Sequence, residues 1–494
     1  MPSLFEINTR SWILGAGLTS IADVPATYWR TLRDYGVEYV WLMGVWQTAQ
    51  SSISKYCFHP DLLREYTKAN AAWKKADVGG SPYAIEDYHT SMLVGSDEDL
   101  LKARSDINEA GMKLVLDFVP NHFNADTPLI RTHPDIFFQR SAEEARQYGS
   151  TFYSTANGSF AHGRDPYFDP WTDTVQLNYF NPATQDFMLE TLTQISKYCD
   201  GVRCDMAMLI LPDIFDKTWS HLKTNSQQAS NFWQKAIQTI KSSNPSFIFI
   251  AEAYWETEWR LQQDGFDYTY DKRLLDLLVH HDFDGLLNHL SADQAFQARM
   301  LRFIENHDET RSLSSLGSPA SQAAASIIAT IPGMTLYFDG QWEGARKKVP
   351  VQLVIPADEP NCPCPIGSEL CLEEGPALCS CQSVHYHSIL RAVNRDVFHK
   401  GDWKLINQPT LNGILAWSWT YESEVAIVFV NYSPEHRTGI IEIGHASDQI
   451  GTFLDILNRE TKPSYFQHQD KGSWQIQLPP YKSSIISFGF KNQN

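Results

Sequence analysis

The stretch KLVLDFVPNH, residues 113–122, joins a short apolar run of strand type to a polar end. A helix is predicted directly before it, because Ser96 and Asp99 form a capping box that opens a helix reaching Ala110. A helix that leads into a strand of this kind is the unit from which parallel sheets are built. The fold therefore depends on how often this unit recurs.

Apolar runs of the same type recur along the chain as far as Phe338, with helical patterns between them. The 3.6-residue spacing of Phe187, Thr191 and Ile195 predicts one of these helices. The predicted strands are Ser3–Ile7, Tyr39–Met43, Lys113–Val119, Gly201–Asp205, Phe247–Ala251, Phe266–Tyr270, Met300–Ile304 and Met334–Phe338. Eight alternations favour an α/β fold in the form of a closed (β/α)8 TIM barrel.

Two segments depart from this alternation. Residues 123–178, after the third strand, are aromatic and contain Gly and Pro without a clear period, which indicates an inserted subdomain. After about Lys400 the pattern changes to period-two runs between turn residues, which is typical of an antiparallel β domain. We therefore predict a catalytic barrel of residues 1–122 and 179–398, an inserted subdomain of residues 123–178, and a C-terminal antiparallel β domain of residues 399–494.

Composition narrows the classes of protein that fit. The 494 residues are 43% hydrophobic and 20% charged, which is a globular balance with enough apolar residues for a large core. The formal net charge of −18 repels phosphate backbones and anionic lipids, so we expect neither nucleic acid nor membrane partners.

Two segments of the barrel region bear on targeting to a membrane or out of the cell. Residues 1–10 reach Glu6 before any apolar run long enough for a secretory signal, so a cytoplasmic location is expected. The uncharged stretch Ser312–Phe338 is interrupted by Pro332 and Gly333, unlike a segment that spans a bilayer. It predicts a buried helix followed by a strand.

Reactive residues gather where strands end. The third, fourth, fifth and seventh predicted strands end in Asp117 to His122, Arg203 with Asp205, Glu252, and Glu305 to Asp308. Active sites of (β/α)8 barrels lie at the C-terminal ends of their strands. A lone carboxylate at a strand end is more often a helix cap or a surface charge, but four such ends together predict one active site.

The fourth and fifth strand ends suggest a pair of carboxyl groups with different pKa values. Arg203 and Asp205 are two residues apart on a strand, so their side chains share a face. We expect Arg203 to lower the pKa of Asp205 and keep it ionised, as a nucleophile requires, although the two could equally form a structural ion pair. Glu252 follows an apolar run, and partial burial would raise its pKa and suit it to donate a proton. This is the arrangement of a glycosidase.

In these residues the sequence resembles the α-amylase family, glycoside hydrolase family 13. Four motifs occur in the family's order, namely Asp117 to His122, Gly201 to Asp205, Glu252, and Asn306 to Asp308, with a fifth at Gln176 to Asn178. The resemblance implies that Asp205 is the nucleophile, Glu252 the general acid and base, and Asp308 the carboxylate that stabilises the transition state. Asp117 is expected to brace the barrel mouth.

The resemblance also implies how the sugar is held. Arg203, His122 and His307 would bind the sugar at the cleavage point, and Tyr83 would form an aromatic platform under it, unless Tyr83 only packs on the barrel rim. Met208 and Leu209 stand where many α-amylases have a Lys-His pair, so the second half of the substrate is not specified.

Metal sites are left open by the sequence. Asn121 matches one ligand of the structural calcium that family members often hold, but the flanking His is missing. Five cysteines lie in one Pro-rich and Gly-rich stretch, Cys362, Cys364, Cys371, Cys379 and Cys381. They could ligate zinc or iron together with His385 or His387, form disulfides, or stay reduced. Cys57, Cys199 and Cys204 are predicted to be small core residues.

The leading interpretation is a retaining glycoside hydrolase that cleaves α-glucosidic bonds in α-1,4-glucans or maltooligosaccharides. Its chemistry needs no cofactor, and its partner is an oligo- or polysaccharide substrate. An α-glucosyl transferase and a non-catalytic sugar-binding protein are alternatives. A barrel enzyme with a divalent metal on Asp117, His122, Asp205 and Glu252 is disfavoured, because the cation of Arg203 would compete with the metal.

Overall fold

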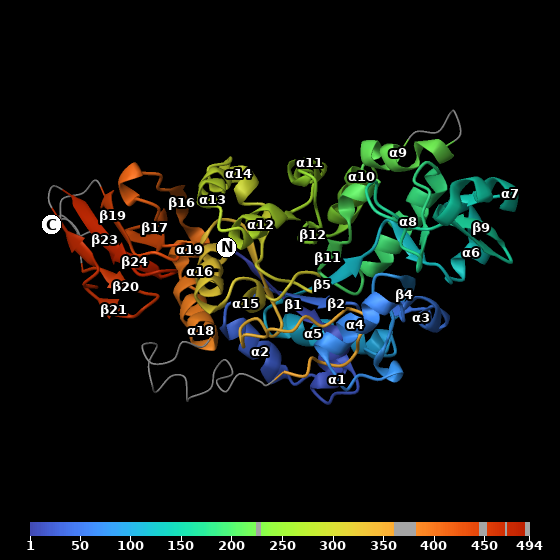
Figure 1. Ribbon diagram of the computed structural model, residues 1–494, viewed down its shortest axis with the longest axis horizontal. Helices are drawn as coiled ribbons and strands as arrows, with labels where there is room; N and C mark the ends of the chain where they lie inside the picture. Colours follow the sequence, from blue (N-terminus) through green and yellow to red (C-terminus); the bar gives the residue numbers. More distant parts are fainter. Residues whose placement is uncertain (224–228, 360–381, 444–451, 470–471, 490–494) are drawn as a thin grey trace.

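Eight parallel strands close into a barrel in the computed structural model, which describes residues 1–223, 229–359, 382–443, 452–469 and 472–489 (Figure 1). The strands follow the order β1-β15-β14-β13-β12-β11-β5-β2 around the barrel. They are β1 Ser3–Asn8, β2 Tyr39–Met43, β5 Lys113–Phe118, β11 Gly201–Cys204, β12 Ile248–Ala251, β13 Tyr268–Tyr270, β14 Met300–Arg302 and β15 Met334–Phe338. All eight predicted strands and the TIM barrel are confirmed.

Helices surround the barrel, so its strands are buried on both faces and consist of near-continuous apolar runs. All five residues of β15 and all four of β12 are buried, for example. The main helices are α1 Thr9–Gly15, α2 Ala26–Asp34, α5 Asp97–Glu109, α8 Pro182–Ile195, α9 Pro212–Trp219, α10 Phe232–Ser243, α11 Glu258–Asp264, α12 Lys272–Val279, α13 Phe283–Leu290, α16 Ser318–Thr330 and α18 Gln382–Val393. Shorter helices are α6 Leu129–Thr132, α7 Ala142–Ala145, α14 Gln294–Gln297, α15 Ser312–Ser315 and α19 Asp396–Lys400.

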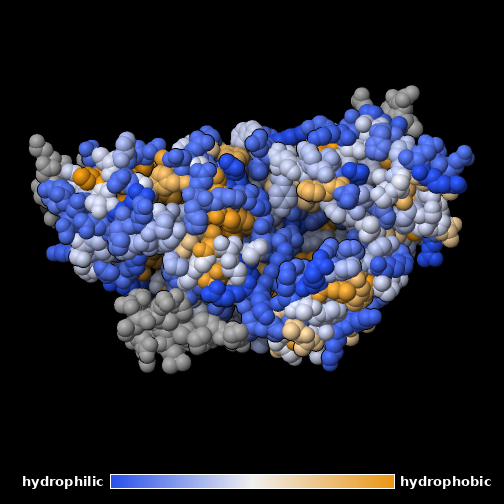
Figure 2. Space-filling view, viewed as in Figure 1, coloured by the Kyte–Doolittle hydropathy of each residue, from blue (hydrophilic) through white to orange (hydrophobic). Residues whose placement is uncertain are grey.

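Two local predictions can be followed in these helices. The Ser96 hydroxyl accepts the N–H of Asp99, and the Asp99 carboxylate accepts the N–H of Ser96, which is the predicted capping box of α5. The uncharged stretch forms α16 and β15, a buried helix followed by a strand. Within the described residues, no helix has the length and apolar character needed to cross a membrane. Hydrophilic side chains cover most of the face seen in Figure 2.

The connection between β2 and α5 contains more secondary structure than the sequence pattern predicts. It contains α3 Gln50–Tyr56, α4 Pro60–Ala69 and the antiparallel strands β3 Trp46–Thr48 and β4 Ile85–Thr90. The β3 strand is three residues long and pairs with β4 in an irregular register, so neither strand shows a sustained period. This connection matters because it carries Tyr56 and Tyr83 to the barrel mouth.

The insert after β5 contains the antiparallel sheet β7-β9-β8, formed by Gln139–Arg140, Gly158–Ala161 and Phe152–Thr155. It is tied to the barrel by β6 His122–Asn124, which pairs with β10 Thr174–Gln176. In Figure 1 the insert and the C-terminal sheets lie at opposite ends of the long axis.

The C-terminal region contains a six-stranded and a three-stranded antiparallel sheet, as predicted. Its strands are β16 Asp402–Leu405, β17 Leu415–Tyr421, β18 Glu424–Val430, β19 Arg437–Glu442, β20 Leu454–Asp455, β21 Glu460–Thr461, β22 Phe466–His468, β23 Ser473–Leu478 and β24 Ser483–Gly489. The exact domain boundaries at 122, 178 and 398 stay a prediction.

Candidate active site

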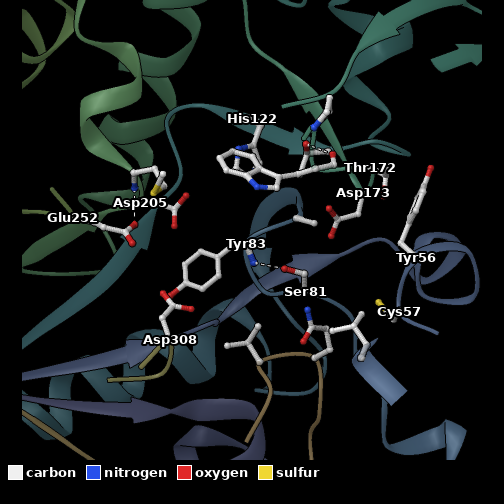
Figure 3. A pocket seen from close by; sticks show the side chains of 18 residues that line it. Tyr56, Cys57, Ser81, Tyr83, His122, Thr172, Asp173, Asp205, Glu252 and Asp308 are labelled. Atoms are coloured by element: carbon white, nitrogen blue, oxygen red, sulfur yellow. Dashed lines mark hydrogen bonds between the residues drawn. The ribbon is translucent and has the colours of Figure 1, made fainter. Parts of the chain in front are cut away.

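A cavity of about 500 Å³ lies at the C-terminal ends of the barrel strands (Figure 3). Its wall contains five of the seven residues proposed from the sequence, Tyr83, His122, Asp205, Glu252 and Asp308. The other two, Arg203 and His307, are buried behind this wall and contact it. The structure thus brings all seven residues together at one place. In Figure 3, Asp205 and Glu252 lie on one side of Tyr83, whereas Asp173 and Tyr56 lie on the other.

Arg203 links the two carboxylates of the fourth and fifth strand ends. Its Nη1 lies 2.9 Å from Oδ1 of Asp205, and its Nη2 forms an ion pair at 2.8 Å with Oε2 of Glu252. Its Nε donates to the hydroxyl of Tyr270 at 3.1 Å. A third carboxylate, that of Asp117, lies 3.8 Å from Nη1. One buried guanidinium therefore serves three carboxylates.

This sharing overturns the predicted ionisation of Asp205. The two-residue spacing of Arg203 and Asp205 predicts that Arg203 lowers the pKa of Asp205. Instead, burial and the charge of Glu252 outweigh Arg203 and raise the pKa of Asp205 to about 8. The reason is that a single positive charge is divided among three acids, while only 7% of Asp205 is exposed to water.

Glu252 is buried, as its position after an apolar strand predicts, but polar donors surround its carboxylate. Its Oε2 accepts the N–H of Met206 at 2.7 Å, and its Oε1 accepts the hydroxyl of Tyr254 at 2.8 Å. Met206 has a left-handed backbone, with φ of 44°. This conformation is uncommon for a residue with a side chain, and here it turns the chain after Asp205 so that the N–H faces Glu252.

The seventh strand end has a different electrostatic arrangement. Nε2 of His307 lies 3.0 Å from Oδ2 of Asp308 and 2.8 Å from the hydroxyl of Tyr83, and Nδ1 contacts Oε1 of the buried Glu6. Burial alone would lower the pKa of His307, but Asp308 and Glu6 raise it to about 10. In turn, the positive charge of His307 outweighs the effect of burial on Asp308 and holds the pKa of Asp308 well below its usual range.

The second histidine of the site, His122, is neutral. Burial lowers the pKa of His122 to about 4. Its ring packs against Trp171 of the insert, with 5.3 Å between the ring centroids. His122 can therefore exchange hydrogen bonds with a sugar hydroxyl without adding charge, whereas His307 is a cation.

Asp117 has the bracing position that was predicted for it. It is buried, its carboxylate accepts the N–H of Gly44 at 3.0 Å, and its carbonyl accepts the indole N–H of Trp46 at 2.7 Å. Met208 and Leu209 are buried in the short 3-10 helix Ala207–Ile210 and are not part of the cavity wall.

Several residues of the site were missed in the sequence. Glu6 could have been found, because it is a carboxylate between the apolar residues Phe5 and Ile7 of strand β1. The wall residues Tyr56, Trp171 and Asp173 lie on the elaborate β2 connection or in the insert. These segments have no period that would have placed their side chains.

The structural calcium at Asn121 stays a prediction, and the Asn121 side chain is hydrogen-bonded within the protein. Oδ1 of Asn121 accepts the amide N–H of Gln176 at 3.0 Å. Among the residues that the structure describes, no three His, Cys, Asp or Glu side chains are grouped so as to hold a metal ion. Cys57, Cys199 and Cys204 are buried free thiols, as predicted. The clustered cysteines, Cys362, Cys364, Cys371, Cys379 and Cys381, lie outside the described residues.

Similarity to solved structures supports the fold. A noncanonic maltogenic alpha-amylase AmyB from Thermotoga neapolitana superposes with a TM-score of 0.70 at 18% identity, covering 99% of both chains. A trehalose-6-phosphate hydrolase from Bacillus licheniformis superposes with a TM-score of 0.66 at 14% identity, also covering 99% of both chains.

Sequence comparisons identify the family. Alpha-amylase MalA of Haloarcula japonica is 24% identical over 272 residues, which are 53% of this chain and 36% of that protein. A cyclomaltodextrin glucanotransferase of a Bacillus species is 20% identical over 333 residues, 62% of this chain and 42% of that protein. The chain therefore matches less than half the length of these two relatives. The family model of the alpha-amylase catalytic domain matches residues 30–358, which is more than half of the chain, and the protein accordingly belongs to the alpha-amylase family.

Proposed function

We propose that the protein is a retaining glycoside hydrolase that cleaves α-glucosidic bonds in α-1,4-glucans or maltooligosaccharides. The observation that carries this proposal is that Asp205, Glu252 and Asp308 face one cavity from three different strand ends. Membership of the alpha-amylase family, and the names of the amylases that the chain resembles, favour α-glucans as the substrate class.

The reaction is proposed to take two steps. In the first, Asp205 attacks the anomeric carbon while Glu252 gives a proton to the departing oxygen, which leaves a sugar ester on Asp205. In the second, Glu252 takes a proton from water, and the water oxygen displaces Asp205. Each step inverts the anomeric carbon, so its configuration is retained overall. Two carboxylates on one guanidinium are close neighbours, which favours the separation of about 5 Å that retaining enzymes use.

The two steps require one proton on the Asp205–Glu252 pair. In the free site burial and the charge of Glu252 raise the pKa of Asp205, so the pair can hold this proton near neutral pH, while the Glu252 carboxylate accepts hydrogen bonds from Met206 and Tyr254. A departing oxygen beside Glu252 would favour the protonated form of Glu252. Asp205 would then be ionised, and Arg203, which contacts both carboxylates, would balance its negative charge as it attacks the sugar.

The remaining residues are proposed to hold the sugar. Ionised Asp308 would accept hydrogen bonds from the hydroxyls of the sugar, because His307 keeps Asp308 charged. Tyr83 would lie under the apolar face of the sugar ring. The aromatic ring of Tyr83 is held in place because it stacks on His307 and its hydroxyl forms a 2.8 Å hydrogen bond with Nε2 of His307. Neutral His122 would contribute hydrogen bonds alone.

Product analysis tests the proposal. The protein is incubated with maltooligosaccharides, soluble starch, sucrose and trehalose, and the products are separated by chromatography. We expect shorter maltooligosaccharides, released as the α-anomer in an NMR time course. Release of the β-anomer first would contradict the retaining mechanism. Products longer than the substrate would assign the protein to the transferases. This outcome is worth testing because the chain is similar to a cyclomaltodextrin glucanotransferase. Binding without turnover would indicate a non-catalytic sugar-binding protein.

A further inference from the structure

The active-site cavity has two ends, and the two reacting carboxylates lie at one of them. In Figure 3, Asp205 and Glu252 are on one side of Tyr83, whereas Asp173 and Tyr56 are on the other. Because Glu252 is proposed to give its proton to the departing oxygen, the departing part of the substrate lies at the Glu252 end. The sugars on the non-reducing side of the cleaved bond therefore extend past Tyr83 toward Asp173.

Three segments that are far apart in the sequence complete the cavity wall beyond the strand ends. Tyr56 ends α3 and Leu62 lies on α4, both in the β2 connection. Asp173 belongs to the insert, directly before β10, and Gln352 belongs to the chain that follows β15. These segments, and not the barrel itself, determine how far a sugar chain can extend past Tyr83.

The three segments are fastened to one another. Lys55 of α3 forms an ion pair at 2.7 Å with Asp126 of the insert. The N–H of Gly79, in the β2 connection, donates at 2.9 Å to the carbonyl oxygen of Gln352. The cavity that they enclose with the strand ends has a volume of about 500 Å³, which is within the usual range for a small-molecule ligand. It suits the end of a sugar chain and not its interior.

Asp173 brings a carboxylate without a partner to this end of the cavity. Within the part of the chain that the structure describes, no other residue donates a hydrogen bond to this carboxylate or forms an ion pair with it. Burial raises the pKa of Asp173, since only its own N–H opposes the effect. A polar group that is removed from water without a partner is costly. The hydroxyls of a terminal sugar would supply the donors that the carboxylate lacks.

The charges of the wall indicate which kind of sugar end fits. Among the wall residues that the structure describes, four are carboxylates and none is Lys or Arg. His122, the histidine in the wall, is neutral because burial lowers its pKa to about 4. A phosphorylated or acidic sugar would meet negative charge without a cation to balance it. The wall is therefore suited to a neutral, unmodified sugar.

We propose that the protein is exo-acting, and that it removes a mono- or disaccharide from the neutral non-reducing end of a maltooligosaccharide. In this arrangement Asp173 binds the hydroxyls of the terminal sugar, and the wall around Tyr56 stops the chain there. The inference rests on the function proposed above and narrows it, since it states at which bond of the chain the reaction takes place.

A blocked substrate tests the inference on the unmodified full chain. Nitrophenyl maltoheptaoside is compared with the same glycoside carrying an ethylidene acetal on the last two hydroxyls of its non-reducing end. Chromatography with mass spectrometry identifies the first products. We expect the free glycoside to lose a mono- or disaccharide from its non-reducing end. For the blocked glycoside kcat/KM should be at least about a hundredfold lower, because the acetal adds bulk and removes two hydroxyl donors.

The products separate failure of this inference from failure of the proposed function. Cleavage of both glycosides at internal bonds with equal kcat/KM would overturn exo-action and leave the proposed function standing. Cleavage of neither glycoside would overturn both.

A matched pair of variants tests Asp173. Asp173→Asn should raise KM for the free glycoside at least about tenfold and change kcat less than about twofold, because it weakens binding away from the reacting atoms. Asp169→Asn changes an exposed carboxylate of the same insert that is outside the cavity wall, and it should leave both constants unchanged. An unchanged KM in Asp173→Asn would overturn the inference. If Asp173→Asn did not fold, the blocked glycoside would still decide, since that comparison uses the parent protein.

Discussion

Two regions of the barrel mouth place a carboxylate beside a cation, and the outcomes are opposite. At the β11 and β12 ends, the pKa of Asp205 is raised to about 8 although Arg203 touches it. At the β14 end, the pKa of Asp308 is lowered, and His307 is the cation that lowers it.

The balance of charges around each carboxylate explains the difference. The side chain of Asp205 is 9% exposed, and its cation is also in contact with Glu252 and near Asp117. The cation beside Asp308 has only Glu6 as a second carboxylate among the contacts described, and Arg203 and Lys348 also lower the pKa of Asp308. A neighbouring cation therefore does not by itself fix the sign of a pKa shift.

The largest effect is expected from Asp205→Asn. If Asp205 is the nucleophile, this change should lower kcat at least about 10⁴-fold, because the amide cannot form the sugar ester. A mechanism-based fluoro-glycoside should label Asp205 in the parent protein, with the labelled peptide identified by mass spectrometry.

Circular dichroism should show that the Asp205→Asn variant stays folded, since the change removes one of three acids that compete for Arg203. Labelling of Glu252 or Asp308 in place of Asp205 would assign the nucleophile to the other carboxylate.

The second largest effect is expected from Glu252→Gln. Without a proton donor, hydrolysis of starch should fall about 10²- to 10⁴-fold. Nitrophenyl and fluoride glycosides should lose much less rate in the first step, because their leaving groups need little protonation. Single-turnover kinetics with both kinds of substrate measures this contrast. Equal losses would mean that Glu252 is not the proton donor, and Asp308 would be the next candidate.

The pH profile should report on the shared proton with a smaller effect. The active pair holds one proton, and the raised pKa of Asp205 means that the free site loses it as the pH rises through about 8. We expect kcat/KM to fall about tenfold per pH unit above that value, and to fall again in acid when the pair takes up a second proton. Initial rates with a neutral oligosaccharide measure both limbs.

The alkaline limb should disappear in Glu252→Gln, which removes the largest neighbouring charge that raises the pKa of Asp205. An alkaline limb that persists unchanged in this variant would mean that another group, and not the Asp205–Glu252 pair, loses the proton.

The sequence predicted the barrel and the seven clustered residues because both depend on local patterns. Apolar runs such as Met334–Phe338 have a clear strand signal, and parallel topology then brings their ends to one rim. The partners of these residues depend on long connections without a period. Trp171 lies in the insert, and Tyr56 lies in the β2 connection.

The predicted pKa of Asp205 was wrong for a related reason. The two-residue spacing on β11 showed that Arg203 is next to Asp205. It did not show that Arg203 also contacts Glu252, which directly follows the neighbouring strand β12. Residue spacing identifies only the neighbours on the same strand, whereas the pKa of a buried carboxyl group depends on all the charges around it.

The smallest effect is expected from Glu6→Gln, which tests the other half of the comparison. Glu6 is buried and touches Nδ1 of His307, on the far side of the ring from Asp308. The amide keeps the shape but removes one of two charges that raise the pKa of His307. We expect this pKa to fall from about 10 while staying above its ordinary value, and kcat to fall several-fold, up to about tenfold. NMR titration of the His307 ring and steady-state kinetics measure the two changes.

Glu305→Gln is the matched control for this prediction. Glu305 is also a buried carboxylate at the β14 end, but it binds Arg311 and the N–H of Ser312. The Glu305→Gln change should lower the melting temperature and leave the pKa of His307 unchanged. If Glu6→Gln lowered the melting temperature without moving the pKa of His307, Glu6 would be a packing residue only. The low pKa of Asp308 would then come from His307 together with Arg203 and Lys348, and the contrast with Asp205 would depend on the number of cations more than on the count of carboxylates.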